Sequence, residues 1–172
     1  DHLEIIDGQQ RIATTIIFYS ALRNFMLELK DDEAAKQFEN DYLFRKELKT
    51  REINPKISLG AEDNDLFREN IIESKPPTKM PVTKNSHERI EQAYKIADNF
   101  VHQQYSRNGK AIEFLIDIAD FIKSKVQIII VTVDNDTNAF TVFETLNDRG
   151  IALSQTDLIK NYLFNKSGKS RL

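Results

Sequence analysis

The residues best suited to chemistry form the motif Asp7-Gly8-Gln9-Gln10-Arg11, between a short apolar run and a segment with helical spacing. A strand, a tight glycine turn at Gly8 and a helix together aim backbone N–H groups and a helix N-terminus at an anion. Asp7 offers a carboxylate for a cation, and Gln9 and Gln10 offer amide donors. Arg11 adds a planar guanidinium that matches phosphate. These residue types predict one half of a nucleotide-phosphate site.

A second polar cluster lies near the end of the sequence, at Asn147, Arg149 and Gly150. Asn147 can present an amide to a base or a ribose, and Arg149 is a second guanidinium suited to phosphate. Gly150 suits a left-handed helix stop. Lys160 lies about one turn inside a final predicted helix that opens at Asp157. We expect the two clusters to meet at one edge of a sheet and to share an anion pocket.

Each of these features also has a structural interpretation that needs no ligand. Asp7-Gly8 alone is an ordinary turn, and in isolation that interpretation is favoured by roughly two to one. The segment 9–11 can be a solvated first helical turn. The segment 147–150 can be only a helix C-cap, and Lys160 can simply face solvent.

Two other groups of charged or titratable residues receive no functional assignment from the sequence. The cations Arg45, Lys46, Lys49 and Arg51 are interpreted as a solvated face, because acidic residues interrupt them. The three histidines are isolated, and none lies in a metal-ligand pattern, so we predict no catalytic role for them. These histidines are His2, His87 and His102.

Composition indicates one soluble domain with a real core. The chain has 172 residues, of which 40% are hydrophobic and 30% charged, and it has no apolar run of the ~20 residues that span a bilayer. The absence of cysteine excludes disulfides and thiolate metal sites. A net charge of −3 argues against a nucleic-acid footprint over the whole surface, although a local basic site stays open. We expect a cytoplasmic location and no membrane contact.

Hydrophobic periodicity predicts a helix-rich α/β fold. Ser86 is predicted to cap one of the helices. The β-branched run at 126–133 predicts a central strand buried on both faces. The other expected elements are helices over 10–30, 31–48, 63–72, 87–105, 112–122, 138–146 and 158–163, a strand at 56–59 and a surface loop at 74–81.

At this point the motifs carry a family resemblance. The segment 6–15 resembles the first signature of the DGQQR family, and the segment 143–161 resembles its second. This family includes the N-terminal half of GmrSD-type modification-dependent restriction systems and is distantly similar to the ParB and sulfiredoxin fold. The resemblance implies a small mixed sheet of a ParB-like core, built from residues 1–30 and 125–165, with a large helical insertion at 31–124.

The same resemblance implies a Mg²⁺-dependent nucleoside-triphosphate (NTP) hydrolase in phage defence, which reaches DNA through the full-length protein. It implies that Asp7 binds the metal, that Gln10 orients the attacking water, and that Arg11 stabilises charge on the transferred phosphoryl group. The residues implied to bind the nucleotide are Gly8, Gln9, Asn147, Arg149, Gly150 and Lys160.

Two departures from the family pattern accompany this resemblance. The family's upstream segment with a Tyr-Gln-Arg motif and a tryptophan is missing, and so is its C-terminal HNH-type nuclease region. We therefore expect the chain to be a piece of a longer protein that is weak or inactive alone, with a fused or separate nuclease as partner. The competing hypothesis is a non-catalytic scaffold that senses nucleotide or DNA. Direct nicking of DNA by this domain ranks last.

Overall fold

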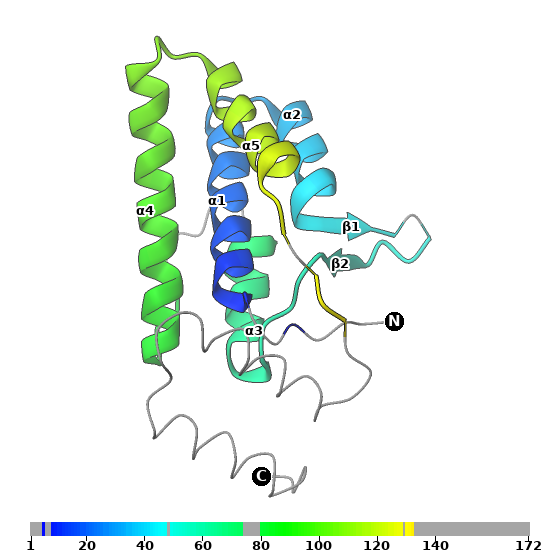
Figure 1. Ribbon diagram of the computed structural model, residues 1–172. Coiled ribbons are helices and arrows are strands. Elements are labelled where there is room, and N and C mark those ends of the chain that lie inside the picture. Colours follow the sequence, from blue (N-terminus) through cyan, green and yellow to red (C-terminus); the bar gives the residue numbers. More distant parts are fainter. Residues whose placement is uncertain (1–4, 6–7, 48, 74–79, 129, 133–172) are drawn as a thin grey trace, which may run out of the picture. The chain divides into compact units, whose positions relative to one another are not determined.

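The computed structural model divides the chain into two compact units, which are described separately below (Figure 1). One unit comprises residues 1–9 and 127–172, and the other comprises residues 10–126. The described helices and strands lie in the second unit, apart from Gln9, the first residue of the first helix. The structure describes residues 5, 8–47, 49–73, 80–128 and 130–132.

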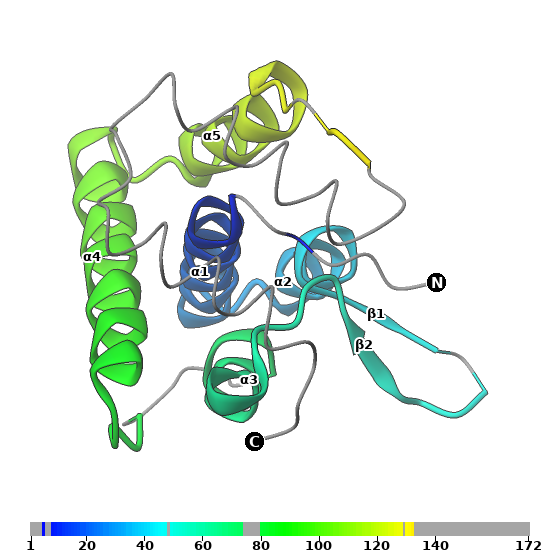
Figure 2. The ribbon, with the colours of Figure 1, turned by 60° about the horizontal axis from the view of Figure 1, so that its bottom comes forward.

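Helix α1 (Gln9–Glu28) is the centre of the unit formed by residues 10–126. The other described helices surround it in both ribbon views (Figures 1 and 2). Every residue from Tyr19 to Met26 is buried, so this helix is covered on all sides over two turns. A helix buried all round needs apolar residues beyond a single stripe, and the segment supplies them. The helix predicted over 10–30 is therefore present, and it is buried on more than one side.

The surrounding helices carry their apolar residues at helical spacing. The short helices α2 and α3 each continue into one π-helical turn. The elements are α2 (Asp32–Phe38), η1 (Glu39–Leu43), α3 (Ala61–Phe67), η2 (Arg68–Ile72), α4 (Asn85–Arg107) and α5 (Ile112–Lys125). Asp31 caps α2, since its carboxylate accepts the Ala34 N–H at 3.1 Å. None of the described helices is both long and apolar enough to cross a membrane.

A β-hairpin follows η1 directly. Strand β1 (Phe44–Lys46) pairs antiparallel with β2 (Ile53–Pro55), with Arg45 opposite Asn54. The predicted helix over 31–48 therefore ends early. The predicted strand at 56–59 is also misplaced, although its alternation of half-buried and exposed residues is real and begins at Ile53. Because β1 offers only three residues for pairing, β2 ends at Pro55.

Two further predictions are wrong. Ser86 does not cap α4; its hydroxyl donates to the Asp63 carboxylate at 2.7 Å and joins α4 to α3. Residues 126–128 and 130–132 belong to no strand, and Val126, Ile128 and Ile130 are exposed. A β-branched composition favours a strand, but the strand also needs a hydrogen-bonded neighbour. Among the described residues the single sheet is the β1–β2 pair, which excludes this segment.

The helix-rich α/β class is confirmed, with a two-stranded antiparallel sheet in the described part of the chain. The predicted mixed ParB-like sheet and its division of the chain stay predictions. The helices predicted at 138–146 and 158–163, and most of the loop at 74–81, lie outside the described residues.

Arg23 lies at the centre of the buried polar contacts, with no exposed surface. Its Nη1 lies 2.8 Å from the Glu39 carboxylate, and its guanidinium donates to the carbonyls of Ile71 at 3.1 Å and Ile72 at 3.2 Å. Burial lowers the pKa of Arg23, and the hydrogen bond and charge of Glu39 oppose that shift. One side chain of α1 thus joins the start of η1 to the end of η2.

The same network reaches α4 through Asn24. The Arg23 Nε donates to the Asn24 amide oxygen at 2.6 Å, and the Asn24 amide donates to the Tyr94 hydroxyl at 2.6 Å. Ser20 donates to the Ile71 carbonyl at 2.6 Å. Buried polar groups of this kind are stable only when their partners are supplied, so the network fixes how α1, the π-helical turns and α4 pack.

We expect Arg23→Ala to lower the free energy of unfolding by about 3–5 kcal/mol, because it leaves the Glu39 carboxylate buried without its cation. Urea denaturation measures the loss. Arg68→Ala is the matched control, since Arg68 pairs with Glu73 at the surface, where solvent screens the ion pair, and its loss should change stability little. Equal stability of the two variants would contradict the central role of Arg23.

Candidate functional site

The turn before α1 has the glycine geometry that the motif predicts. Gly8 has a φ of +85°, in the left-handed region that favours glycine. The Gln9 side-chain amide donates one hydrogen bond to the carbonyl of Ile5, and its second N–H and its oxygen can still bind a ligand. The turn is thus confirmed at Gly8, while Asp7 lies outside the described residues.

The next residues of the motif lie on the exposed start of α1. Gln10 and Arg11 are exposed, and together with Thr14 and Thr15 they line a shallow, open surface depression. The two threonine hydroxyls donate to the carbonyls of Gln10 at 2.8 Å and Arg11 at 2.9 Å. Their protons are therefore used within the helix, while each hydroxyl oxygen can still accept a hydrogen bond or contact a cation.

This depression offers both N–H hydrogen-bond donors and hydroxyl oxygen acceptors. The Gln10 amide and the Arg11 guanidinium can donate to phosphate oxygens, whereas the threonine oxygens suit water or a hard cation. Thr14 and Thr15 are not among the predicted site residues, although their helical spacing from Gln10 and Arg11 is visible in the sequence. The predicted site residues Asn147, Arg149, Gly150 and Lys160 lie outside the described residues, so a shared pocket stays a prediction.

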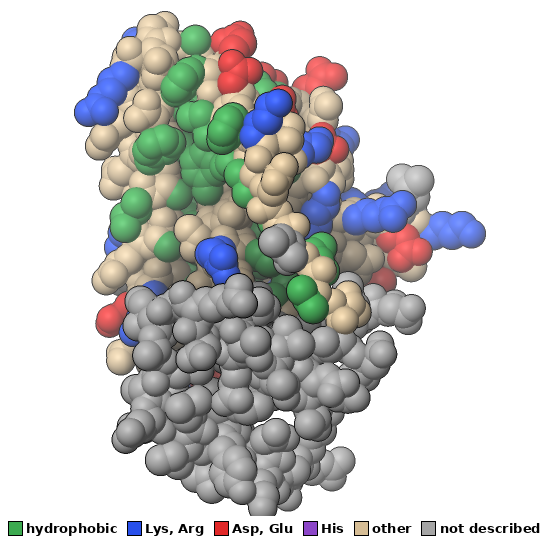
Figure 3. All heavy atoms as spheres, viewed as in Figure 1, with side chains coloured by type: hydrophobic (Ala, Val, Ile, Leu, Met, Phe, Trp, Pro, Cys, Tyr) green, Lys and Arg blue, Asp and Glu red, His purple; other side chains and the backbone are tan. Residues whose placement is uncertain are grey.

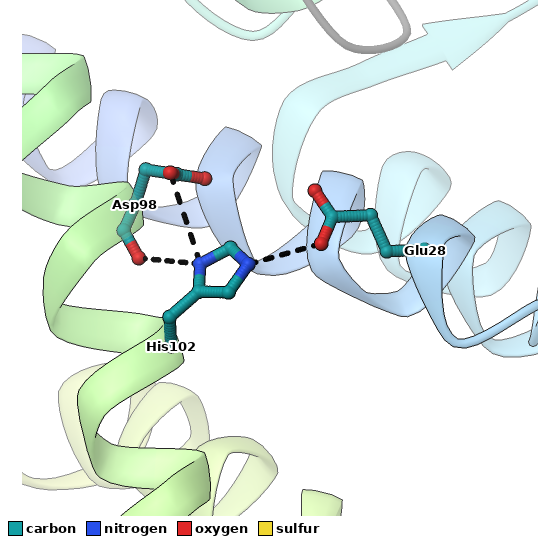
Figure 4. A group of neighbouring side chains, drawn as sticks. All are labelled: Glu28, Asp98 and His102. Carbon is teal, nitrogen blue, oxygen red and sulfur yellow. Dashed lines mark hydrogen bonds and ion pairs between the residues drawn. The ribbon is translucent and has the colours of Figure 1, made fainter.

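A second group of titratable side chains joins the other end of α1 to α4 (Figure 4). The Nε2 of His102 lies 3.0 Å from the Glu28 carboxylate, and its Nδ1 lies 2.9 Å from the Asp98 carbonyl and 3.7 Å from the Asp98 carboxylate. One donor atom from each residue lies within 4.8 Å of the others, a spacing that can hold a metal ion. Sequence analysis treated His102 as isolated, because Glu28 is 74 positions away.

The geometry of this cluster suits a proton better than a metal ion. A carbonyl oxygen only accepts, so the Nδ1 of His102 carries a proton, and the Glu28 carboxylate requires a second proton on Nε2. A single metal ion binds one ring nitrogen, whereas here the two carboxylates lie at different nitrogens. The arrangement therefore describes a charged imidazolium that links α1 to α4.

The pKa values of the cluster agree with a charged histidine. Partial burial lowers the pKa of His102, but the Asp98 carbonyl and the carboxylates of Glu28 and Asp98 outweigh it, so the pKa is raised above 6.5. Burial raises the pKa of Asp98; the charge of His102 opposes this rise and that of Glu28 adds to it. Phe25 packs edge-on against the imidazole ring from α1.

We expect the protein to lose stability as the pH rises through the raised pKa of His102. The contacts that raise the folded-state pKa contribute their full stabilisation below the ordinary pKa of 6.5. This stabilisation is lost as the pH rises above the folded-state pKa. His102 is 44% exposed, so solvent screening limits the effect to at most ~1 kcal/mol. Urea denaturation from pH 6 upward measures it, and His102→Gln should flatten the pH dependence. An unchanged slope in that variant would contradict the assignment.

The comparison with known proteins covers nearly the whole chain. No curated protein matches it. Residues 1–164 match the family described as GmrSD restriction endonuclease, N-terminal domain, which covers both signature segments. The chain therefore belongs to the family of GmrSD restriction endonuclease N-terminal domains.

Proposed function

We propose that this chain is the NTP-binding and NTP-hydrolysing module of a GmrSD-type restriction system. The observation that carries the proposal is the left-handed Gly8 directly before α1, with Gln10 and Arg11 exposed on the first turn of that helix. A helix N-terminus favours negative charge, and a guanidinium on the same turn adds a bidentate phosphate donor. Membership of the family supplies the connection to DNA restriction.

In this proposal Arg11 donates to the oxygens of the transferred phosphoryl group and stabilises their charge. Gln10 orients the attacking water through its amide. The oxygens of Thr14 and Thr15 accept hydrogen bonds from waters at the same surface. These oxygens and the Asp7 carboxylate are hard donors that fit Mg²⁺, which would neutralise phosphate charge when bound.

The second signature completes the proposed site. Arg149 is the second cation for the phosphates, and Asn147, Gly150 and Lys160 contact the rest of the nucleotide. Gln9 donates one N–H to the Ile5 carbonyl, and its second N–H and its oxygen contact the nucleotide. A fused or separate HNH-type nuclease then cleaves DNA, and we place the system in the cytoplasm.

We expect Arg11→Ala and Asp7→Ala each to lower the rate of phosphate release at least about 100-fold, because each removes a group that stabilises developing charge. Phosphate release from each of the four common NTPs, with Mg²⁺ and with EDTA, measures the rate in the full-length protein. Arg107→Ala is the matched control, since it removes one exposed cation from the last turn of α4 and should leave the rate unchanged.

Unchanged turnover in both motif variants would remove the catalytic assignment. Tight NTP binding without any phosphate release by the unaltered protein would identify a nucleotide sensor, and the hydrolase proposal would then be wrong. Binding of a non-hydrolysable NTP analogue separates these outcomes.

A further inference from the structure

The β1–β2 hairpin concentrates positive charge in an acidic protein. Residues 45–56 contain five cations and two acids, whereas the whole chain has a formal net charge of −3. The hairpin extends away from the helices in both ribbon views (Figures 1 and 2), and basic side chains gather on this projection in Figure 3. The cations are Arg45, Lys46, Lys49, Arg51 and Lys56.

Four of these cations have exposed side chains with no partner in the part of the chain that the structure describes. No ion pair or hydrogen bond among the described residues uses the side chain of Arg45, Lys46, Lys49 or Arg51. Lys56 differs, because its ammonium donates to the Asp41 carbonyl. A partner that binds the first four cations therefore breaks no existing contact of their side chains.

The loop that carries these cations is held by its own hydrogen bonds. The backbone N–H of Glu47 donates to the Glu52 carbonyl, and that of Arg51 donates to the Glu47 carbonyl, both at 2.9 Å. Thr50 donates to the Glu47 carboxylate at 3.2 Å, and the Glu52 N–H donates to the Thr50 hydroxyl at 3.2 Å. Arg51 has a φ of +60°, a conformation that glycine adopts more readily. Hydrogen bonds thus link the described residues on the two sides of this loop.

We propose that this hairpin is a docking surface for the phosphate backbone of duplex DNA. A two-stranded ribbon is narrow enough to enter the major groove of duplex DNA, and the phosphates of both DNA strands flank that groove. The alternative partner, an acidic protein surface, is less favoured because the family acts in DNA restriction. In this respect the proposal rests on the proposed function.

The test uses the full-length protein and a fluorescent DNA duplex titrated at several salt concentrations. The hairpin variant carries Arg45→Gln, Lys46→Gln, Lys49→Gln and Arg51→Gly. Each lost phosphate contact lowers the slope of log affinity against log salt by about 0.9, so we expect the loss of four contacts to lower it by about 3.6 and to weaken the Kd at least roughly tenfold. Arg51→Gly keeps the left-handed turn while it removes the charge.

The matched control removes two arginines and two lysines elsewhere: Arg89→Gln, Arg107→Gln, Lys125→Gln and Lys110→Gly. Lys110 also has a left-handed φ, +61°, so both variants replace one such cation by glycine. We expect the control to bind DNA with nearly the original salt slope. Equal losses in the two variants would show a general charge effect and overturn the proposal.

A second variant should change the affinity for duplex DNA in the opposite direction. Glu52 is exposed, and Glu52→Gln should tighten duplex binding severalfold, a gain that misfolding cannot produce. Unchanged DNA affinity in both the hairpin variant and Glu52→Gln would overturn the proposal and leave the acidic-protein alternative. NTP turnover is measured on the same samples without DNA. If only the hairpin proposal is wrong, the unaltered protein and the hairpin variant both hydrolyse NTP. If the proposed function is wrong, the unaltered protein shows no NTP turnover.

Discussion

The buried guanidinium of Arg23 is the constraint on which the arrangement of this unit depends. A fully buried cation is tolerated only where carboxylate and carbonyl oxygens surround it, and here they come from Glu39, Ile71 and Ile72. These groups lie in two π-helical turns, η1 and η2, that are far apart in the sequence. Ile71 and Ile72 are the last two residues of η2, where a helix end leaves carbonyls without helical partners, and the cation supplies donors to them.

Helix α1 carries this constraint between two exposed ends. Its 20 residues span about 30 Å at 1.5 Å per residue. The buried middle fixes the helix axis, so Arg11 at the start and Glu28 at the end belong to separate surfaces of one rigid element. That separation lets the start present polar groups to an anion while the end forms an ion pair with α4 through His102.

The sequence predicts the helices well because apolar periodicity is a local property. It also predicts the Gly8 turn, which the φ of +85° confirms. It could not predict the partners of Arg23, since Ile71 is 48 positions away, nor the contact between Glu28 and His102. The strand at 126–133 was inferred from β-branched composition alone, and composition does not supply a neighbouring strand. The proposed nucleotide site likewise requires two segments far apart in the sequence to meet, which local patterns cannot establish.

The sequence interprets the cations at 45, 46, 49 and 51 as a solvated face, and in the structure all four are exposed. In the structure the Glu47 carboxylate accepts from Thr50, and its backbone closes the loop. Because β1 begins directly after η1, and η1 begins at the Glu39 that Arg23 binds, the hairpin emerges from the most constrained part of the unit. A hairpin attached to a structured segment loses less conformational entropy when its cations bind a polyanion than an unstructured basic tail would lose.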